Sequence, residues 1–349
     1  MKQYPLPNSS AKIVIKDNIV AVTSNTPLTT ISSGIYNGGY KKVHAILNVS
    51  VPDNYNDKHL HDDPMNLVYD AQKNLQITTD CIAMLTAAKI QNLSIVTRQI
   101  GDITITAVVT AGWRHGESAG EVIESNHYTH GTINIIVILN ANPTDSCLVS
   151  LFLTATEAKT AAMNDYDIRS RYSGDVATGT ITDSLSVAVT GQGEKIELGG
   201  PASDVGQLVA SAVRQAVKEA ADKQEGPHKG RALDRRLSER HLSVDYLAME
   251  LSKAHVFGDQ KVIVSTLERI LTADPVSAMF LLAAAKLDDD FKKELIPYEL
   301  GDLSVLSEEF GCLFLRGHPS EVVPLLSEVN LPPFTRKAVI AIIQNSDKH

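Results

Sequence analysis

The sequence predicts a mixed α/β sandwich with antiparallel hairpins, followed by a smaller all-α domain. Residues 1–225 contain 21 Thr and 15 Gly, whereas residues 226–349 contain 3 Thr and 6 Gly. Because threonine favours strands and glycine marks turns, the first part is expected to be rich in sheet and the second to be mostly helical. The segment 221–231 is polar and contains a Gly-Pro step, which is typical of a linker. We therefore expect two domains, residues 1–225 and 226–349.

The first domain is expected to begin with hairpins. Residues 12–22 form two short β-rich runs around Lys16-Asp17-Asn18, and residues 93–98 are followed by a second such run, 103–110, after a Gly-Asp turn. Residues 65–86, between these hairpins, are expected to be helical. Since hairpin strands pair antiparallel, the interleaved strands and helices predict a mixed sandwich and not a doubly wound parallel sheet.

The rest of the first domain is expected to alternate strands with helices. Residues 133–139 are almost entirely apolar, which is typical of a central strand covered on both faces. The run Asn142-Pro143-Thr144-Asp145 marks the start of a helix that extends to about residue 163. A strand is expected over residues 184–190. Asp204 is expected to begin an amphipathic helix, with Gln207 in the capping-box position.

Composition and charge exclude several classes of protein. Hydrophobic residues make up 43% of the chain and charged residues 21%, as in an ordinary globular protein. The net charge of -9, without a local basic patch, predicts no nucleic-acid partner and no binding to an anionic membrane. No apolar stretch is long enough to cross a bilayer, and the first ten residues do not resemble a signal peptide. Three widely spaced cysteines predict no disulfide framework, so we expect a cytoplasmic protein.

One segment matches a catalytic motif without its context. Residues 116–120 read G-x-S-x-G, a pattern that in α/β-hydrolases places a nucleophilic serine between a strand and a long helix. Neither flank of the segment has the required pattern, so we expect a Gly-rich loop. P-loop and complete G-x-G-x-x-G motifs are absent, which argues against a P-loop enzyme and a dinucleotide-binding domain.

Histidines occur at spacings that metal sites use. His59 and His61 form one pair, and His127 and His130 form another. Both pairs lie in polar segments without an HExxH helix, so solvated loop side chains are the favoured interpretation and no metal is expected. A metal site formed by His115, His127 and His130 is the alternative.

A charged segment occurs in the helix that follows Asn142. Thr156, Lys159, Thr160 and Met163 share one face of this helix, and Glu157 lies beside them. Burying ionic groups is costly unless they are paired, so the glutamate and the lysine should either bond each other or line a pocket. From the residues alone, a structural ion pair and a functional site stay equally open.

A second polar cluster precedes the strand at Ser184. Residues 175–183 contain three threonine hydroxyls, a glycine and the carboxylate of Asp183, which together offer hydrogen-bond donors and a base. The alternative is a polar turn in which the threonines cap their own backbone.

Five short segments carry a resemblance to a known family. They are Thr110-Ala111-Gly112, Gly131-Thr132-Ile133-Asn134-Ile135, 156–161 (Thr-Glu-Ala-Lys-Thr-Ala), 177–183 (Ala-Thr-Gly-Thr-Ile-Thr-Asp) and 200–206 (Gly-Pro-Ala-Ser-Asp-Val-Gly). In this order they resemble motifs of the adenosylcobinamide amidohydrolases, enzymes of archaeal-type corrinoid salvage. The match covers most of residues 90–222, with departures at 116–120 and 199–203.

The resemblance implies hydrolysis of the amide that joins aminopropanol, or its phosphate, to the corrin ring of adenosylcobinamide. The product would be adenosylcobyric acid, which enters cobalamin synthesis. No cofactor is expected, because the substrate carries its own cobalt. The expected partner is therefore the small-molecule corrinoid substrate.

The resemblance makes both polar clusters expected parts of the site, with roles that follow from residue chemistry. Glu157 or Asp183 would activate water or a threonine hydroxyl, and Lys159, Asn134 and N–H groups near Gly179 would stabilise the oxyanion. The expected catalytic residues are Glu157, Lys159, Thr180, Thr182 and Asp183. The expected substrate-binding residues are Trp113, Asn134, Thr156, Thr160, Thr178 and Gly179.

Alternatives remain for three of these predictions. Trp113, the only tryptophan, could stack on the corrin face or pack in the core. The chain could be a corrinoid-binding module without chemistry, although the D-x-H-x-x-G motif of methyl-transfer modules is absent. Residues 226–349 could dock a partner or mediate self-association into a homo-oligomer.

Overall fold

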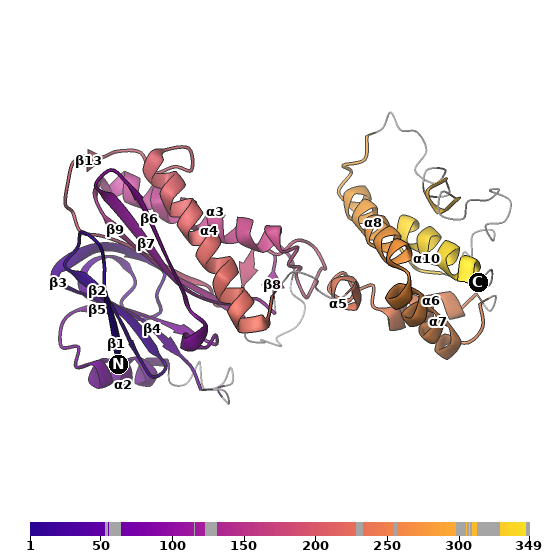
Figure 1. Ribbon diagram of the computed structural model, residues 1–349, viewed down its shortest axis with the longest axis horizontal. Helices are drawn as coiled ribbons and strands as arrows, with labels where there is room; N and C mark the ends of the chain where they lie inside the picture. Colours follow the sequence, from indigo (N-terminus) through magenta and orange to yellow (C-terminus); the bar gives the residue numbers. More distant parts are fainter. Residues whose placement is uncertain are drawn as a thin grey trace. The chain divides into compact units, whose positions relative to one another are not determined.

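The protein is described by a computed structural model covering residues 1–52, 55, 64–114, 116–122, 131–227, 233–254, 257–297, 305, 307, 309–312 and 329–346. The chain divides into two compact units, Met1–His228 and Lys229–His349 (Figure 1). Each unit has its own hydrophobic core. The first unit combines a large sheet with helices, and the second is helical throughout its described residues.

A nine-stranded sheet forms the framework of the first unit. Its main path runs in the order β1-β2-β3-β12-β9-β7-β6, and β4 pairs with both β3 and β5. The pairs β9–β12 and β4–β5 are parallel, whereas the other neighbours are antiparallel. The strands are β1 Lys2–Pro5, β2 Ala11–Lys16, β3 Ile19–Ser32, β4 Gly39–Ser50, β5 Cys81–Thr86, β6 Ser94–Ile100, β7 Ile103–Gly112, β9 Thr132–Asn140 and β12 Ser184–Val189.

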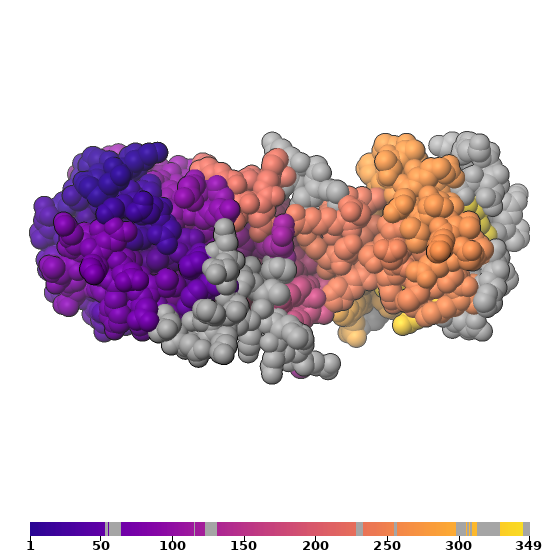
Figure 2. All heavy atoms as spheres, turned by 90° about the horizontal axis from the view of Figure 1, so that it is seen from below, coloured from indigo at the N-terminus to yellow at the C-terminus, as the bar shows by residue number. Residues whose placement is uncertain are grey.

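The sheet curls into two layers, with helices on both outer faces (Figure 1). Helices α3 (Asp145–Asp165) and α4 (Asp204–Glu225) pack on the outer face of β6, β7, β9 and β12. Helix α2 (Pro64–Leu75) packs on the outer face of β3, β4 and β5. A third apolar core lies between the two sheet layers. The predicted mixed α/β sandwich is therefore confirmed. Figure 2 shows this unit from below, with the N-terminal end of the chain in indigo.

Most predicted elements occur where the sequence places them. The first hairpin is β2–β3, with Lys16 opposite Ile19, and the second is β6–β7, with Ile100 opposite Ile103. Strand β9 is central, because β7 and β12 pair with its two edges and all but its last residue are buried. Helix α3 begins after Thr144, whose hydroxyl accepts the Cys147 N–H, as predicted from the polar run before it.

The predicted helix over residues 65–86 is wrong in its second half. Helix α2 ends at Leu75, where Gln76 takes a positive φ of 57°, and residues 81–86 form strand β5. All six residues of β5 are buried, because α2 covers one face and the inner core covers the other. A short apolar run of this kind has no period that separates a buried strand from a buried helix.

Helix α4 begins at Asp204, as predicted, but its cap differs from the predicted capping box. Its N-cap is Ser203, whose hydroxyl accepts the Gly206 N–H, whereas Gln207 donates to the Ala202 carbonyl and forms no capping box. Gly206 is required here, since a Cβ atom would lie 1.9 Å from the Gly200 carbonyl oxygen. The helix start is therefore packed directly against the preceding loop.

The described elements of the second unit are helices, and buried carboxylates form hydrogen bonds between its segments. Asp288 accepts the N–H groups of Phe334 and Thr335 at the start of the last helix, and Glu250 accepts the Asn330 N–H. Within the described residues, no single helix is long and apolar enough to cross a membrane, and only α7 and α8 taken together, bent by 107°, reach that length and hydropathy. The helices are α5 Leu233–Ser238, α6 Val244–Ser252, α7 Gln260–Ala273, α8 Pro275–Lys292 and α10 Pro333–Ser346.

Asp165, the last residue of α3, ties this helix to α4. Its carboxylate accepts hydrogen bonds from Arg214 Nε at 2.9 Å and Nη2 at 2.5 Å, and from Lys218 Nζ at 2.9 Å. The Arg214 hydrogen bond is the main cause that lowers the pKa of Asp165 to about 2, with Lys218 adding to it and burial opposing it.

Asp165→Asn should therefore lower the free energy of unfolding at neutral pH by about 1 kcal/mol, because solvent around the half-exposed Arg214 screens the interaction. The folded-state pKa is depressed, so this stabilisation is complete above the ordinary value of 3.8 and is lost as the pH falls towards about 2. Urea unfolding at pH 7 and near pH 2 measures the difference, with Asp102→Asn in the exposed β6–β7 turn as the control. A difference that does not change with pH would contradict the assignment.

Candidate active site

The centre of the candidate site is the carboxylate of Asp183, in the turn before β12. It forms an ion pair with Lys159 of α3. It also accepts the Ile133 N–H at 2.9 Å, the Thr180 N–H at 3.0 Å and the Thr180 hydroxyl at 2.5 Å. Lys159 and Asp183 keep 12% and 16% of their side chains exposed, so the pair is shielded but reachable. One carboxylate thus joins α3, the start of β9 and the threonine-rich turn.

Gly179 leaves the space in which this ion pair forms. A Cβ atom on Gly179 would lie 2.7 Å from both the Lys159 Nζ and the Asp183 Oδ2. No positive φ is involved, so the glycine is required by close approach and not by backbone conformation.

Two very short strands bring a third charged residue to the pair. Strand β8 (Gly116–Glu117) pairs antiparallel with β11 (Gly179–Thr180), with Glu117 opposite Gly179. The predicted Gly-rich loop at residues 116–120 therefore starts with a strand, and residues 118–122, the described residues that follow it directly, form no helix. The serine does not occupy a nucleophile elbow.

Glu117 is a partly buried carboxylate, 15% exposed, with little support from donors. Its Oε1 accepts no hydrogen bond from the described residues, and Arg171 Nη2 lies 3.6 Å away. Burial is the main cause that raises the pKa of Glu117; the Arg171 charge opposes the shift, and the charges of Glu121 and Asp183 add to it. A carboxyl group with a raised pKa holds its proton more readily than a solvated one, which makes it a candidate for proton transfer.

Glu121, four residues further on, has the opposite environment. The Ser170 hydroxyl lies 2.7 and 2.6 Å from its two oxygens, the Ser173 hydroxyl donates at 2.7 Å, and the Ser118 N–H donates at 2.8 Å. Burial works against ionisation of Glu121, yet these hydrogen bonds together lower its pKa. The two neighbouring carboxylates therefore have pKa shifts in opposite directions.

The threonines of the predicted site fasten the turn to its neighbours. Thr160 donates to the Thr178 carbonyl at 2.9 Å, and the Thr178 hydroxyl accepts the Ala119 N–H at 2.9 Å. Thr182 donates to the Gly131 carbonyl at 3.1 Å. These three predicted residues thus lie around the Lys159–Asp183 pair and hold the segments that surround it.

Glu157 lies away from this cluster. It is two positions from Lys159 on α3, which is about 200° around a helix, and it lines a hollow of about 420 Å³ between α3 and α4. Its side chain is exposed, and the Lys159 ammonium bonds Asp183 instead. The Thr156 hydroxyl donates to the Phe152 carbonyl of its own helix. The glutamate–lysine bond that we considered from the sequence does not form.

Trp113 and Asn134 are both buried. Trp113 is 5% exposed and packs edge-on against Tyr166, with ring centroids 4.9 Å apart, which favours core packing over stacking on a ligand. Asn134 is completely buried between the sheet layers, where its Nδ2 donates to Asn48 Oδ1 at 2.8 Å and to the Leu85 carbonyl at 2.7 Å. In this structure Asn134 joins β9 to β4 and β5.

The alternative metal site cannot be placed. His115, His127 and His130 lie outside the described residues, as do His59 and His61. Within the described part of the chain, no group of three His, Cys, Asp or Glu side chains could hold a metal ion.

Sequence reasoning missed Glu117, and the sequence carries no signal for it. The residue was passed over inside a motif that resembled a nucleophile elbow. Its importance comes from the pairing of β8 with β11, two strands of two residues each that lie far apart in the chain. Strands this short have no periodicity to detect.

The comparisons with known proteins agree with the resemblance in the sequence. The CbiZ family model, described as adenosylcobinamide amidohydrolase, matches residues 5–229. An uncharacterized protein of Methanocaldococcus jannaschii is 34% identical over 208 residues, which cover 54% of this chain and 80% of that protein. The adenosylcobinamide amidohydrolase of Methanosarcina mazei is 26% identical over 213 residues, which cover 58% and 94%.

The chain belongs to the adenosylcobinamide amidohydrolase family. The family name indicates a hydrolase that acts on adenosylcobinamide. The match ends at residue 229, so it includes little of the second unit.

Two solved structures are similar in part. The PH0078 protein from Pyrococcus horikoshii has a TM-score of 0.32 and 13% identity, covering 60% of this chain and 78% of that one. A Burkholderia sp. beta-aminopeptidase has a TM-score of 0.33 and 12% identity, covering 62% and 82%. Neither likeness is close enough to bear on the function.

Gly179→Ala should displace Lys159 from Asp183 and lower the free energy of unfolding by about 1–3 kcal/mol, because a partly buried charge loses its partner. Gly200→Ala is the matched control, since a Cβ atom there meets nothing within 4 Å. Thermal denaturation of both variants checks the expectation. Equal stability of the two would show that the ion pair tolerates the added methyl group.

Proposed function

We propose that this chain hydrolyses the amide that joins aminopropanol, or its phosphate, to the corrin ring of adenosylcobinamide. Water adds to the amide carbonyl and the C–N bond breaks, which gives the carboxylate of adenosylcobyric acid and an amine. Family membership supports the reaction class. The structural observation that supports it most is the position of Glu117, a partly buried carboxyl with a raised pKa beside the Lys159–Asp183 pair.

In the proposed mechanism, Glu117 is the general base and then the general acid. It takes a proton from the attacking water and delivers it to the departing nitrogen, which leaves as a neutral amine. Its raised pKa suits both steps, because a carboxyl that binds its proton more tightly is a stronger base towards water. Of the bases predicted from the sequence, Glu157 lies on the other side of α3, and Asp183 is occupied by four donors.

Lys159 is the proposed source of electrostatic stabilisation for the oxyanion. An ammonium has three N–H donors, and Asp183 accepts one of them. The others can face the negative charge that develops on the amide oxygen. Asp183 acts as a positioning residue that fixes Lys159 and Thr180.

A second route is supported by the 2.5 Å hydrogen bond from the Thr180 hydroxyl to Asp183. In this route Thr180 attacks the carbonyl and its proton passes to Asp183, which delivers it to the nitrogen as the C–N bond breaks. The amine leaves, and water then hydrolyses the ester that remains on Thr180. Thr180→Val distinguishes the two routes, because only the second loses its nucleophile. Turnover within about tenfold of wild type would support the water mechanism.

The reaction itself is tested by incubating the full chain with adenosylcobinamide. We expect aminopropanol and adenosylcobyric acid to appear in equal amounts. Binding of adenosylcobinamide without release of aminopropanol would instead support a corrinoid-binding module. Neither binding nor release would contradict both functions.

Glu117→Gln should lower kcat by roughly two powers of ten or more, because the side chain of glutamine cannot take a proton from the attacking water. Glu157→Gln is the matched control, with the same change on the exposed side of α3 and near-normal kcat expected. The acid limb of the pH–rate profile of the wild type should lie above the ordinary glutamate value of 4.5. Loss of turnover in the Glu157 variant alone would contradict Glu117 as the general base and would support Glu157 instead.

A further inference from the structure

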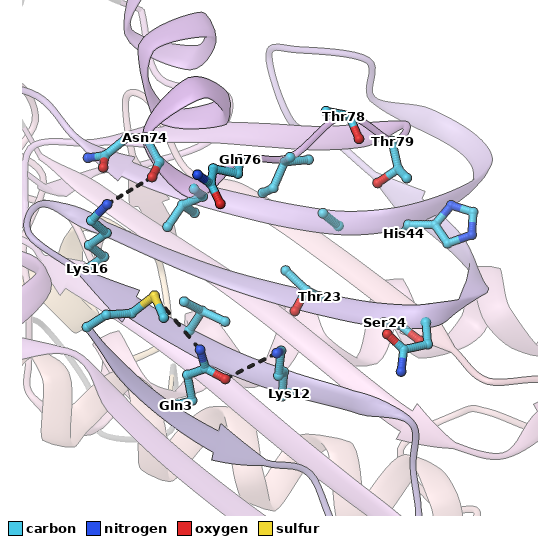
Figure 3. Close-up of a pocket in the computed structure, with 16 residues that line it drawn as sticks. Gln3, Lys12, Lys16, Thr23, Ser24, His44, Asn74, Gln76, Thr78 and Thr79 are labelled. Carbon is cyan, nitrogen blue, oxygen red and sulfur yellow. Dashed lines mark hydrogen bonds between the residues drawn. The ribbon is translucent and has the colours of Figure 1, made fainter.

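A groove opens on the outer face of the sheet, away from the candidate active site. It has a volume of about 720 Å³ and lies between strands β2, β3 and β4 and the segment that follows α2 (Figure 3). The groove is separated from α3 by both sheet layers. One face of the layer formed by β2, β3 and β4 carries the groove, and its opposite face packs on the core between the layers. The volume is in the range of sites for nucleotide-sized ligands.

The charges that line the groove are positive. Its sixteen lining residues include Lys12, Lys16 and His44 and no aspartate or glutamate, on a chain whose net charge is -9. Lys12 Nζ donates to Gln3 at 3.1 Å, and Lys16 Nζ donates to the Asn74 carbonyl at 2.9 Å (Figure 3). Neither ammonium contacts a carboxylate among the described residues, and each has further N–H donors to offer.

Strand β3 bulges beside the groove. The register passes from Thr23 opposite Ala45 to Leu28 opposite Val43, so that four residues of β3 stand against His44 alone. Ser24 and Asn25, which belong to this bulge, line the groove. Bulges are retained where they re-aim side chains, often beside functional sites.

The groove also contains an unsatisfied hydroxyl. Thr23 Oγ1 is shielded from solvent and has no hydrogen-bond partner among the described residues. A buried polar atom without a partner is costly and calls for an explanation. Seven of the other lining side chains are hydroxyls or amides, which suit a ligand with many polar atoms.

We propose that this groove binds a small phosphorylated metabolite of nucleotide size. Lys12 and Lys16 contact the phosphate oxygens, and the hydroxyl and amide side chains contact the polar remainder of the ligand. Asp17, which accepts the Asn74 amide at 3.5 Å, lies just beyond the lining and limits the affinity for free anions. The proposal does not depend on the proposed amidohydrolase activity.

Calorimetric titration of the full chain tests the proposal, with ATP, pyrophosphate and inorganic phosphate as phosphorylated probes and adenosine as the uncharged one. We expect ATP to bind with a Kd of about 10–100 μM and adenosine to bind more weakly than about 1 mM. The double variant Lys12→Gln/Lys16→Gln should weaken ATP binding at least about tenfold. Thr23→Val should weaken it severalfold.

The matched control is Lys41→Gln/Lys42→Gln, which removes the same charge from two residues of β4 that do not line the groove. It should bind ATP like the wild type. The proposal is overturned if ATP does not bind, if adenosine binds as well as ATP, or if both double variants lose affinity equally. Hydrolysis of adenosylcobinamide without added ATP should be the same in the wild type and both double variants. A failure of the ligand-binding proposal can therefore be told apart from a failure of the proposed amidohydrolase activity.

Discussion

The Asp183 carboxylate is the interaction on which the candidate site depends. It accepts donors from α3, from the first residues of β9 and from the turn that leads into β12. An ion pair in partly buried surroundings adds little net stability, but losing one partner leaves the other charge unsupported. The pair therefore matters mainly because it fixes three segments in one arrangement. The β8–β11 pairing then places Glu117 against that arrangement.

The chemistry follows from how donors are distributed among neighbouring carboxylates. Asp183 and Glu121 are surrounded by donors, whereas Glu117 has one distant cation and no hydrogen bond to Oε1 from the described residues. Desolvation without compensating donors keeps a proton on a carboxyl group at higher pH. Glu117 and Glu121, four residues apart, thus have pKa shifts in opposite directions because their surroundings differ.

Sequence patterns predicted the parts of the fold that local physics determines. Alternation and turn chemistry located the hairpins, and a polar run located the start of α3. The patterns failed at β5, where burial on both faces removed the alternation of apolar and polar residues. They also failed to choose between Ser203 and Asp204 as the N-cap of α4, because both side chains can cap a helix. Lys159 and Asp183 were both predicted as site residues, but a contact across 24 residues follows only from the sheet topology. Glu117 was missed for the same reason.

Strand β3 belongs to both layers of the sandwich. Its first half pairs with β2, and its last residues pair with β12, the strand that follows Asp183. In sandwiches made of two separate sheets, the layers can slide across each other by exchanging side-chain contacts. Here such sliding would have to break main-chain hydrogen bonds along β3, so the two sheet layers of the first unit are held in a fixed relative position. Evolution of this chain can vary either face, but it cannot shift one layer without remodelling the other.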